Sequence, residues 1–310
     1  MRLIKPSFEI IEQEPGLEGI YKAIELAGRN CYKSESNIKE GSAKEFVDRM
    51  VKSKHLAMCE HGTVYLKNEN TDSNELSKYI NNKYSIYKNK YIGKKIFQSD
   101  IDYYSEYITT NYRCLVENNW LDDLQYLCKP TEFHEKRIMV RFICDRGVSH
   151  EFVRHRVFSF AQESTRYCNY SKDKFGNELT FIIPSWLDIP EGTAYFHDGI
   201  NFRVGANNTF MGESVNPKAW LKGNWREIDS FLHALYTSER DYKSVLEIGW
   251  TPQQARAILP NALKTELIMT GYIPDWKHFF KLRDSKAAHP QAYELAHPLH
   301  EEFIKRGYLN

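Results

Sequence analysis

Hydrophobic residues recur along this chain at spacings typical of both helices and strands. Helical spacing is clearest over residues 17–31, where Ile20, Ile24 and Ala27 fall on one face, and over residues 226–247. Short apolar or alternating runs between these segments predict strands. The predicted strands are residues 63–67, 138–144, 181–184 and 267–270. The pattern therefore predicts a protein that mixes helices with strands.

Capping residues predict where further helices begin. Ser42, with Glu45 three residues later, has the sequence of a capping box, and Thr251 with Gln254 has another. A third helix is expected to run from Ser149 through His155, because serine favours the N-cap position. Two further helices are expected, from Asp275 through Ala288 and over residues 291–306.

Two long stretches lack these patterns. Residues 68–135 are rich in Asn, Lys, Tyr and Asp, with helical patches such as residues 103–117. Residues 187–224 hold much Gly, Asn and Pro, which predicts a long surface loop. We therefore expect a single domain over residues 1–310, with insertions at about 68–135 and 187–224.

Composition limits the classes of function that remain. Hydrophobic residues make up 42% of the chain and charged residues 27%, as in ordinary globular proteins. The net charge of +1 gives no electrostatic footprint for a nucleic acid or an anionic membrane, so neither partner is expected. The sequence has no signal peptide and no 18-residue apolar run, and a cytoplasmic location is therefore expected.

The cysteines and histidines give no sign of a metal site. The six cysteines are scattered without a Cys-x-x-Cys pair, which favours buried free thiols over a disulfide framework or a zinc site. The eleven histidines contain no His-Glu-x-x-His pattern. No metal cofactor is predicted.

Arginine is concentrated in one part of the chain. Of sixteen arginines, six fall within thirty positions, namely Arg137, Arg141, Arg146, Arg154, Arg156 and Arg166. A guanidinium offers a planar fork of donors to phosphate and carboxylate oxygens, so the cluster predicts a site for a phosphorylated small molecule. The alternative is that these arginines form solvated faces and ordinary ion pairs.

The spacing within the cluster adds detail. Arg154 and Arg156 straddle His155, so their side chains would share one face of an extended segment. Ser164 and Arg166 repeat this spacing, and two such pairs on one loop would suit two phosphate-bearing ligands. The sequence contains neither Gly-x-Gly-x-x-Gly nor a P-loop, so phosphate recognition would rest on arginines and hydroxyls.

Ser164 and His155 also suggest a hydrolase pair. The sequence, however, has no Gly-x-Ser-x-Gly elbow and no evident acid partner. We therefore interpret Ser164 as a hydrogen-bond donor to a ligand, and His155 as a structural or ligand-stacking group rather than a general base.

Arg154-His155-Arg156, followed after seven residues by Ser164, resembles the signature of the flavin-dependent thymidylate synthases. Further segments resemble that family in the same order along the chain. They are residues 26–32, 55–61, 149–151, 255–260 and 276–283. A spaced motif with collinear segments is far more specific than Arg-His-Arg alone.

The resemblance implies an α+β fold with a central, largely antiparallel sheet flanked by helices. It implies a homotetramer whose active sites gather residues from several subunits. It also implies FAD as cofactor, dUMP as substrate, and NADPH and methylenetetrahydrofolate as co-substrates. The implied reaction is the reductive methylation of dUMP to dTMP.

The same resemblance assigns expected roles to single residues. Arg283 is the expected catalytic residue, because it matches the arginine assigned to ionising N3 of the uracil ring. The residues expected to contact FAD are His55, Ala57, Arg154, His155, Arg156, Gln162 and His278. Those expected to surround dUMP are Glu151, Arg154, Gln162, Glu163, Ser164, Thr165, Arg166 (on the phosphate), Arg256 and Arg283.

Two positions depart from the family pattern. Tyr272-Ile273-Pro274 stands where the family usually has an Asn and, two residues later, an Arg that contact the flavin nucleotide. Ala57 replaces a usual Ser or Thr. Two alternatives therefore stay open, namely a related C5 modification of the pyrimidine such as hydroxymethylation, and a non-catalytic nucleotide- or flavin-binding protein. The retained Arg283 favours an enzyme, because a binding protein has less need of a group aimed at the ring.

Overall fold

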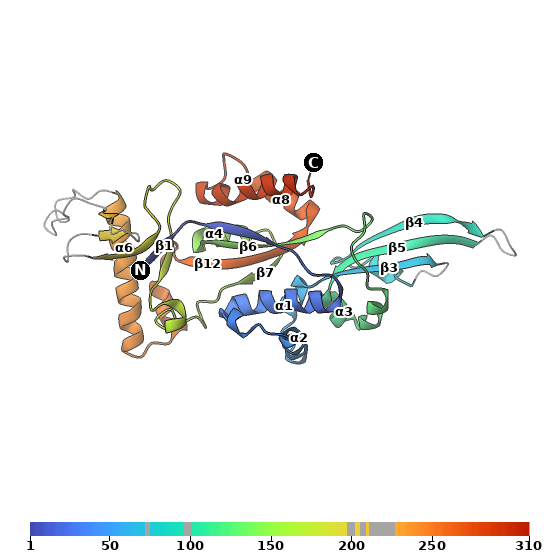
Figure 1. Cartoon of the computed structure of the whole chain (residues 1–310), viewed down its shortest axis with the longest axis horizontal. Coiled ribbons are helices and arrows are strands. Elements are labelled where there is room, and N and C mark those ends of the chain that lie inside the picture. Colours follow the sequence, from blue (N-terminus) through green and yellow to red (C-terminus); the bar gives the residue numbers. More distant parts are fainter. Residues whose placement is uncertain (72–74, 96–100, 197–201, 205–208, 211–226, 310) are drawn as a thin grey trace.

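The structure is a computed structural model that describes residues 1–71, 75–95, 101–196, 202–204, 209–210 and 227–309. The molecule is elongated, with a layered centre and a sheet that projects from one end (Figure 1). No helix in the described ranges is long and apolar enough to cross a membrane.

Antiparallel strands form the sheet at the centre of the molecule. In order across the sheet they are β2 (Ser7–Ile11), β6 (Arg137–Asp145), β12 (Lys264–Tyr272) and β7 (Ser159–Gln162). β6 and β12 pair along their whole lengths, from Lys264 opposite Asp145 to Tyr272 opposite Arg137. The sequence predicts both strands, although the span predicted for β12, residues 267–270, is shorter than the strand in the structure. The expected α+β fold with an antiparallel central sheet is confirmed.

Helices cover both faces of this sheet. α8 (Ile273–Arg283) and α9 (Pro290–Lys305) lie on one face, and α1 (Gly16–Tyr32) lies on the other (Figure 1). Successive residues of a strand point to opposite faces, so Val140 packs against α8 and α9 while Met139 packs against α1. Burial on both faces explains why β6 and β12 are apolar runs rather than alternating strands.

A second sheet lies at the end of the molecule that holds the N-terminus (Figure 1). Its order is β11 (Thr209–Phe210), β10 (Phe202–Val204), β9 (Gly192–Phe196), β1 (Arg2–Ile4) and β8 (Thr180–Ile182). β1 and β8 are parallel, and the other pairs are antiparallel. The long helix α6 (Glu227–Glu247), which the sequence predicts almost to the residue, packs its apolar face against this sheet.

The expectation of a surface loop over residues 187–224 is wrong within the described residues. β9 pairs with β1, and Ala194 of β9 is buried in the core beneath α6. Local composition carries no sign of this pairing, because the partner is the first strand of the chain. Residues 197–201, 205–208 and 211–224 of the expected loop lie outside the described residues.

The third sheet is the one that projects from the body (Figure 1). Its antiparallel strands are, in order, β3 (Thr63–Thr71), β5 (Ile101–Asn111) and β4 (Ile86–Lys95). The expected helix over residues 103–117 is wrong, because β5 takes up its first part and helix α3 spans only Tyr112–Asn118. β5 bonds to a strand on each side, and this pairing outweighs the local helical pattern.

The two predicted capping boxes have different outcomes. The box at Thr251 is confirmed at the start of α7 (Pro252–Ala255). The box at Ser42 is wrong, because Ser42 is already the first residue of α2 (Ser42–Lys52). The Ser42 hydroxyl donates instead to the buried carboxylate of Glu25, 2.9 Å away.

α4 (Arg146–Phe152) begins before its predicted start. The carboxylate of Asp145 caps it by accepting a hydrogen bond from the N–H of Val148 at 2.8 Å. The predicted cap, Ser149, is therefore inside the helix and fully buried, and the helix ends before His155.

α8 also differs from its predicted span, since it starts before Asp275 and ends well before Ala288. Asp275 lies in the first turn, where its carboxylate accepts a hydrogen bond from the N–H of Tyr272 at 3.0 Å. The early end of α8 leaves Arg283 as its last residue.

Short 3₁₀ helices join the larger elements. They are η1 (Glu35–Asn37), η2 (Leu56–His61), η3 (Ser77–Tyr79), η4 (Leu121–Tyr126), η5 (Asp173–Phe175) and η6 (Arg256–Ile258). η2 ends at His61, which is fully buried with Nδ1 2.8 Å from Oγ1 of Thr270. Burial, with a smaller effect from the charge of Arg137, lowers the pKa of His61 to about 3.

We predict that His61 makes the protein less stable in acid. Between pH 6.5 and about 3 the unfolded chain binds a proton at this position and the folded chain does not, so the free energy of unfolding falls as the pH falls. The contribution is about 1.4 kcal/mol per pH unit. Urea unfolding at several pH values should show a shallower dependence for His61→Gln than for the natural chain.

Thr270→Val is the matched control, because it removes the partner of His61 and keeps the imidazole. This variant should lose stability at every pH and retain the pH dependence. Equal slopes for His61→Gln and the natural chain would contradict the assignment.

Candidate active site

The segment after α4 buries His155 and exposes the arginines on each side of it. Only 7% of His155 is accessible, whereas Arg154 and Arg156 are exposed. The backbone turns here, with the N–H of His155 bonded to the carbonyl of Phe152 and the N–H of Phe158 bonded to the carbonyl of His155. The segment is therefore not extended as expected, yet both guanidiniums still reach solvent.

His155 is held as a neutral imidazole. The centre of its ring lies 5.1 Å from the ring centre of Phe279 and 6.1 Å from the ring centre of His278. Burial lowers the pKa of His155 to about 4, helped by the nearby charge of Arg283. The Nε–H of Arg283 donates to Nε2 of His155 at 3.1 Å, which occupies the lone pair that a general base would use.

Arg283 brings the end of α8 to the end of α4. Besides His155, its guanidinium bonds to Glu151 in two places, through Nη1 to the carboxylate and through Nη2 to the backbone carbonyl at 2.8 Å. Only 15% of the Arg283 side chain and 28% of the Glu151 side chain are accessible. Arg283, the expected catalytic residue, is thus joined within a single chain to Glu151, an expected dUMP contact, and to His155, an expected FAD contact.

Gln162 lies beside the same helix. Its side-chain amide, at the end of β7, donates to Oγ of Ser149 at 2.8 Å and to Oγ1 of Thr265 at 3.3 Å. Ser149 is two residues before Glu151 on α4, so Gln162 lies near the Arg283 contacts although it does not touch them.

Glu163 has a different environment from the one expected of a ligand contact. Its side chain is buried, and its carboxylate accepts hydrogen bonds from Tyr170 at 2.9 Å and from Lys264 at 2.8 Å. Lys264 also pairs with Glu266 at 2.7 Å. Burial alone would lower the pKa of Lys264, but the charges of the two carboxylates raise it overall. The Glu163 side chain therefore anchors the loop from the inside.

Residues 164–166 form the end of that loop, which reaches solvent at Arg166. The N–H of Ser164 bonds to the carbonyl of Cys31 at 2.9 Å, which ties the loop to the end of α1. Thr165 is buried, and Arg166 is exposed with its guanidinium 5.3 Å from the ring centre of Tyr167. Arg166 has no carboxylate partner among the described residues, so it is free to bind an anion.

The other predicted residues are not joined to this group. His55 and Ala57 are exposed at η2, Arg256 is exposed at η6, and His278 is exposed on α8 beside the His155 ring. In the described part of the chain, no side-chain hydrogen bond or ion pair links His55 or Arg256 to Arg283.

Sequence reasoning missed Lys264 and Tyr170, which hold the Glu163 carboxylate. One signal was present, because Lys264 and Glu266 put two charges at the start of an otherwise apolar strand. Charges on a buried strand need partners, and that need points to a polar cluster.

Five of the six clustered arginines divide into two groups. Arg137 donates to the carbonyl of Glu60 at 3.1 Å, and Arg141 pairs with Glu9. The ion-pair alternative therefore holds for Arg141, whereas Arg137 is occupied by neutral acceptors inside the protein. Arg154, Arg156 and Arg166 are exposed, and their binding of a ligand stays a prediction.

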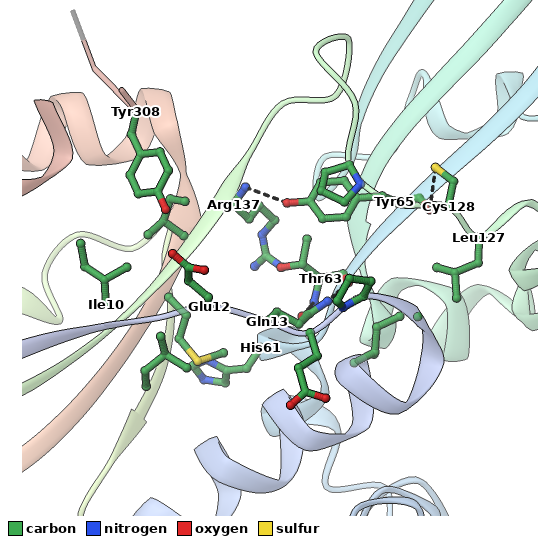
Figure 2. Close-up of a pocket in the computed structure, with 18 residues that line it drawn as sticks. Ile10, Glu12, Gln13, His61, Thr63, Tyr65, Leu127, Cys128, Arg137 and Tyr308 are labelled. Carbon is green, nitrogen blue, oxygen red and sulfur yellow. Dashed lines mark hydrogen bonds between the residues drawn. The ribbon is translucent and has the colours of Figure 1, made fainter. Parts of the chain in front are cut away.

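Arg137 lines a separate pocket, where β2, β3, β6 and the start of α1 meet (Figure 2). Gln13 closes one side of it by pairing with both backbone groups of Thr63, each at 2.8 Å. The pocket measures about 160 Å³, below the range of roughly 300–1,000 Å³ usual for ligand sites. None of the predicted site residues lines it.

Comparison with known proteins gives one family match. The model of the family described as thymidylate synthase complementing protein matches residues 100–306. A flavin-dependent thymidylate synthase of Pyrococcus furiosus is 27% identical over 213 residues, which cover 66% of this chain and 71% of that protein. The enzyme of the same name from Thermococcus kodakarensis is 30% identical over 166 residues, covering 54% of this chain and 53% of that protein.

Several of these relatives are matched over about half of their length; the enzyme of Pyrococcus abyssi, for example, is covered to 53% at 28% identity. Among solved structures, a UMP/dUMP methylase from Streptomyces cacaoi bound with 5-Br dUMP aligns over 98% of this chain and 93% of its own, with a TM-score of 0.39 and 15% identity. A similarity of this size is too low to identify a shared fold.

We predict that the buried pair beneath the loop is needed for stability. Lys264→Met should leave the Glu163 carboxylate buried without its cation and lower the free energy of unfolding by about 3 to 5 kcal/mol. Adding Glu163→Gln to that variant should recover part of the loss, because the uncompensated charge disappears. Urea unfolding of the single and double variants measures both effects. A Lys264→Met variant as stable as the natural chain would show that the pair carries no such weight.

Proposed function

The chain belongs to the family of thymidylate synthase complementing proteins, the flavin-dependent thymidylate synthases, and we propose that it converts dUMP to dTMP by reductive methylation. Methylenetetrahydrofolate would give the carbon, and FAD reduced by NADPH would carry the hydride. The observation that supports the proposal most strongly is the contact of Arg283 with Glu151 and His155, beside the exposed Arg154 and Arg156.

Arg283 is the proposed catalytic residue. A guanidinium held against the pyrimidine would stabilise negative charge that develops on the ring when N3 loses its proton, which makes C5 more nucleophilic. Glu151 and His155 fix the direction of this group, so it need not reorganise during the reaction. His155 would not act as a base here, since its Nε2 already accepts from Arg283.

The nucleotide is proposed to lie between Arg283 and the loop at residues 162–166. Arg166 and the hydroxyl of Ser164 would bind the phosphate, and Gln162, Thr165 and the backbone of Glu163 would line the site. The support is that Arg166 is exposed, whereas the Glu163 carboxylate is already bound inside the protein.

FAD is proposed to bind at Arg154, Arg156 and the exposed ring of His278, with His55 and Ala57 at the edge of its site. The residues present suit a cofactor with phosphates, because neither guanidinium has a carboxylate partner among the described residues. Bound FAD would supply hydride transfer, which no side chain of this protein can perform.

Tyr272, which departs from the family pattern, has a structural role. Its hydroxyl is 2.8 Å from the carbonyl of Thr109 and 2.9 Å from that of Tyr84, so it ties the start of α8 to the projecting sheet. The hydroxyl at this position is therefore already occupied by backbone carbonyls of the same chain.

The active site is proposed to be completed by other copies of the chain, in a homotetramer. The support is that His55 and Arg256 are exposed and do not join the Arg283 group within one chain.

We propose a single catalytic domain over residues 1–310, with residues 68–135 and 187–224 as insertions. The family model covers the second stretch and the later part of the first. A cytoplasmic location follows from the substrates of the proposed reaction.

The proposed reaction has a direct test. Purified protein should bind FAD, and the flavin, once reduced by NADPH, should reoxidise without oxygen only when dUMP and methylenetetrahydrofolate are both present. Mass spectrometry should then find dTMP. A colourless protein that takes up no FAD would exclude the flavin reaction, and 5-hydroxymethyl-dUMP in place of dTMP would favour the hydroxymethylating alternative.

We predict a specific loss in Arg283→Ala. The turnover number for dTMP should fall by at least about 100-fold, as when a donor that stabilises charge in the transition state is removed, while FAD stays bound. Lys281→Ala is the matched control, because Lys281 is an exposed cation on the same helix. Turnover within a few-fold of the natural enzyme would rule out Arg283 as the activating group.

A further inference from the structure

The residue that follows Arg283 is held by two histidines of α9. Oδ1 of Asp284 lies 3.0 Å from Nδ1 of His297, and Oδ2 lies 2.6 Å from Nδ1 of His300. The Asp284 side chain is only 15% accessible, compared with 46% for His297 and 32% for His300. Both carboxylate oxygens are therefore engaged by the neighbouring helix.

Each histidine is also fixed by an aromatic ring. His300 lies flat on Phe280, with ring centres 4.5 Å apart and an angle of 12° between the planes. His297 lies flat on Tyr293, with ring centres 5.1 Å apart and an angle of 9° between the planes. Phe280 is buried in the last turn of α8, so His300 touches that turn through its ring and the following Asp284 through its Nδ1. These contacts restrict the histidine rings more than exposed ion pairs usually do.

The position of Asp284 is not explained by the stability of α8 alone. Asp284 is the C-cap of that helix, and its N–H bonds to the carbonyl of Phe280 at 2.8 Å. The helix macrodipole is negative at this end, so a carboxylate here is unfavourable unless cations or donors compensate for it. His297 and His300 supply the donors, and they do so from another helix. The carboxylate therefore acts as a link between α8 and α9.

We propose that Asp284, His297 and His300 form a clamp that positions Arg283, an inference that rests on the proposed function. The long side chain of Arg283 is held at its tip by Glu151 and His155. The clamp fixes the other end, the backbone from which this side chain starts. With both ends fixed, the guanidinium keeps one direction toward the pyrimidine. The clamp residues touch neither substrate nor cofactor in this scheme and are positioning residues.

Two variants break the clamp with little change of shape. Asp284→Asn keeps the size of the side chain and loses one acceptor oxygen. His300→Phe keeps a ring that can stack on Phe280 and loses the Nδ1 donor. Each variant should lower the turnover number for dTMP by roughly tenfold, because displacement of a catalytic group by less than 1 Å is costly. Bound FAD should not change.

The double variant separates positioning from general damage. Because both changes break the same link, Asp284→Asn combined with His300→Phe should be no slower than the slower single variant. Glu302→Gln is the control on α9, since Glu302 pairs with Arg306 at 2.8 Å and is not among the partners of Asp284. This control should turn over like the natural enzyme. A clamp that served stability alone would lower the melting temperature and leave the turnover number intact, and that result would overturn the proposal.

Hydrogen exchange keeps the test independent of the proposed reaction. Backbone amides of residues 281–285 should exchange faster in Asp284→Asn than in the natural chain, and Glu302→Gln should not change them. If the natural protein forms no dTMP, the proposed function fails, and exchange still decides whether the clamp holds the base of Arg283. Unchanged exchange in Asp284→Asn would refute the clamp.

Discussion

The contact of the Arg283 guanidinium with Glu151 and His155 joins two segments that the central sheet sets far apart. β6 and β12 are antiparallel, so α4, which follows β6, and α8, which follows β12, start at opposite ends of the sheet. α8 then runs back over the sheet for 11 residues, or about 16 Å, and ends at Arg283. The long pairing of β6 with β12 and the early end of α8 are both needed for Arg283 to meet α4.

Charged groups in this region fall into two classes. Glu163, Lys264 and the Glu151–Arg283 pair are wholly or largely buried, and each has partners that offset the cost of removing a charge from water. Arg154, Arg156 and Arg166 are exposed, and in the proposed function their donors bind the anionic ligands. The buried class fixes the shape of this region, and the exposed class is the one proposed to bind phosphates. The overall charge of the chain, which is close to neutral, reveals neither class.

Sequence reasoning succeeded where local pattern decides structure. It predicted α1, α6 and the strands β6 and β12, and its family resemblance is confirmed by the family model. It failed for β5, where pairing with β3 and β4 outweighs a local helical pattern, and for β9, which pairs with β1 at the start of the chain. The motif also pointed to Glu163 without revealing that Lys264, about a hundred residues later, binds its carboxylate. Such contacts depend on tertiary packing, which local periodicity does not encode.

In the proposed active site, Arg283 and the loop ending at Arg166 hold the two ends of one pyrimidine nucleotide. A crystal structure of the protein with FAD and dUMP would test this arrangement. We expect the uracil ring within hydrogen-bonding distance of the Arg283 guanidinium and the phosphate on Arg166. A nucleotide bound elsewhere, with Arg283 still engaged only by Glu151 and His155, would contradict it.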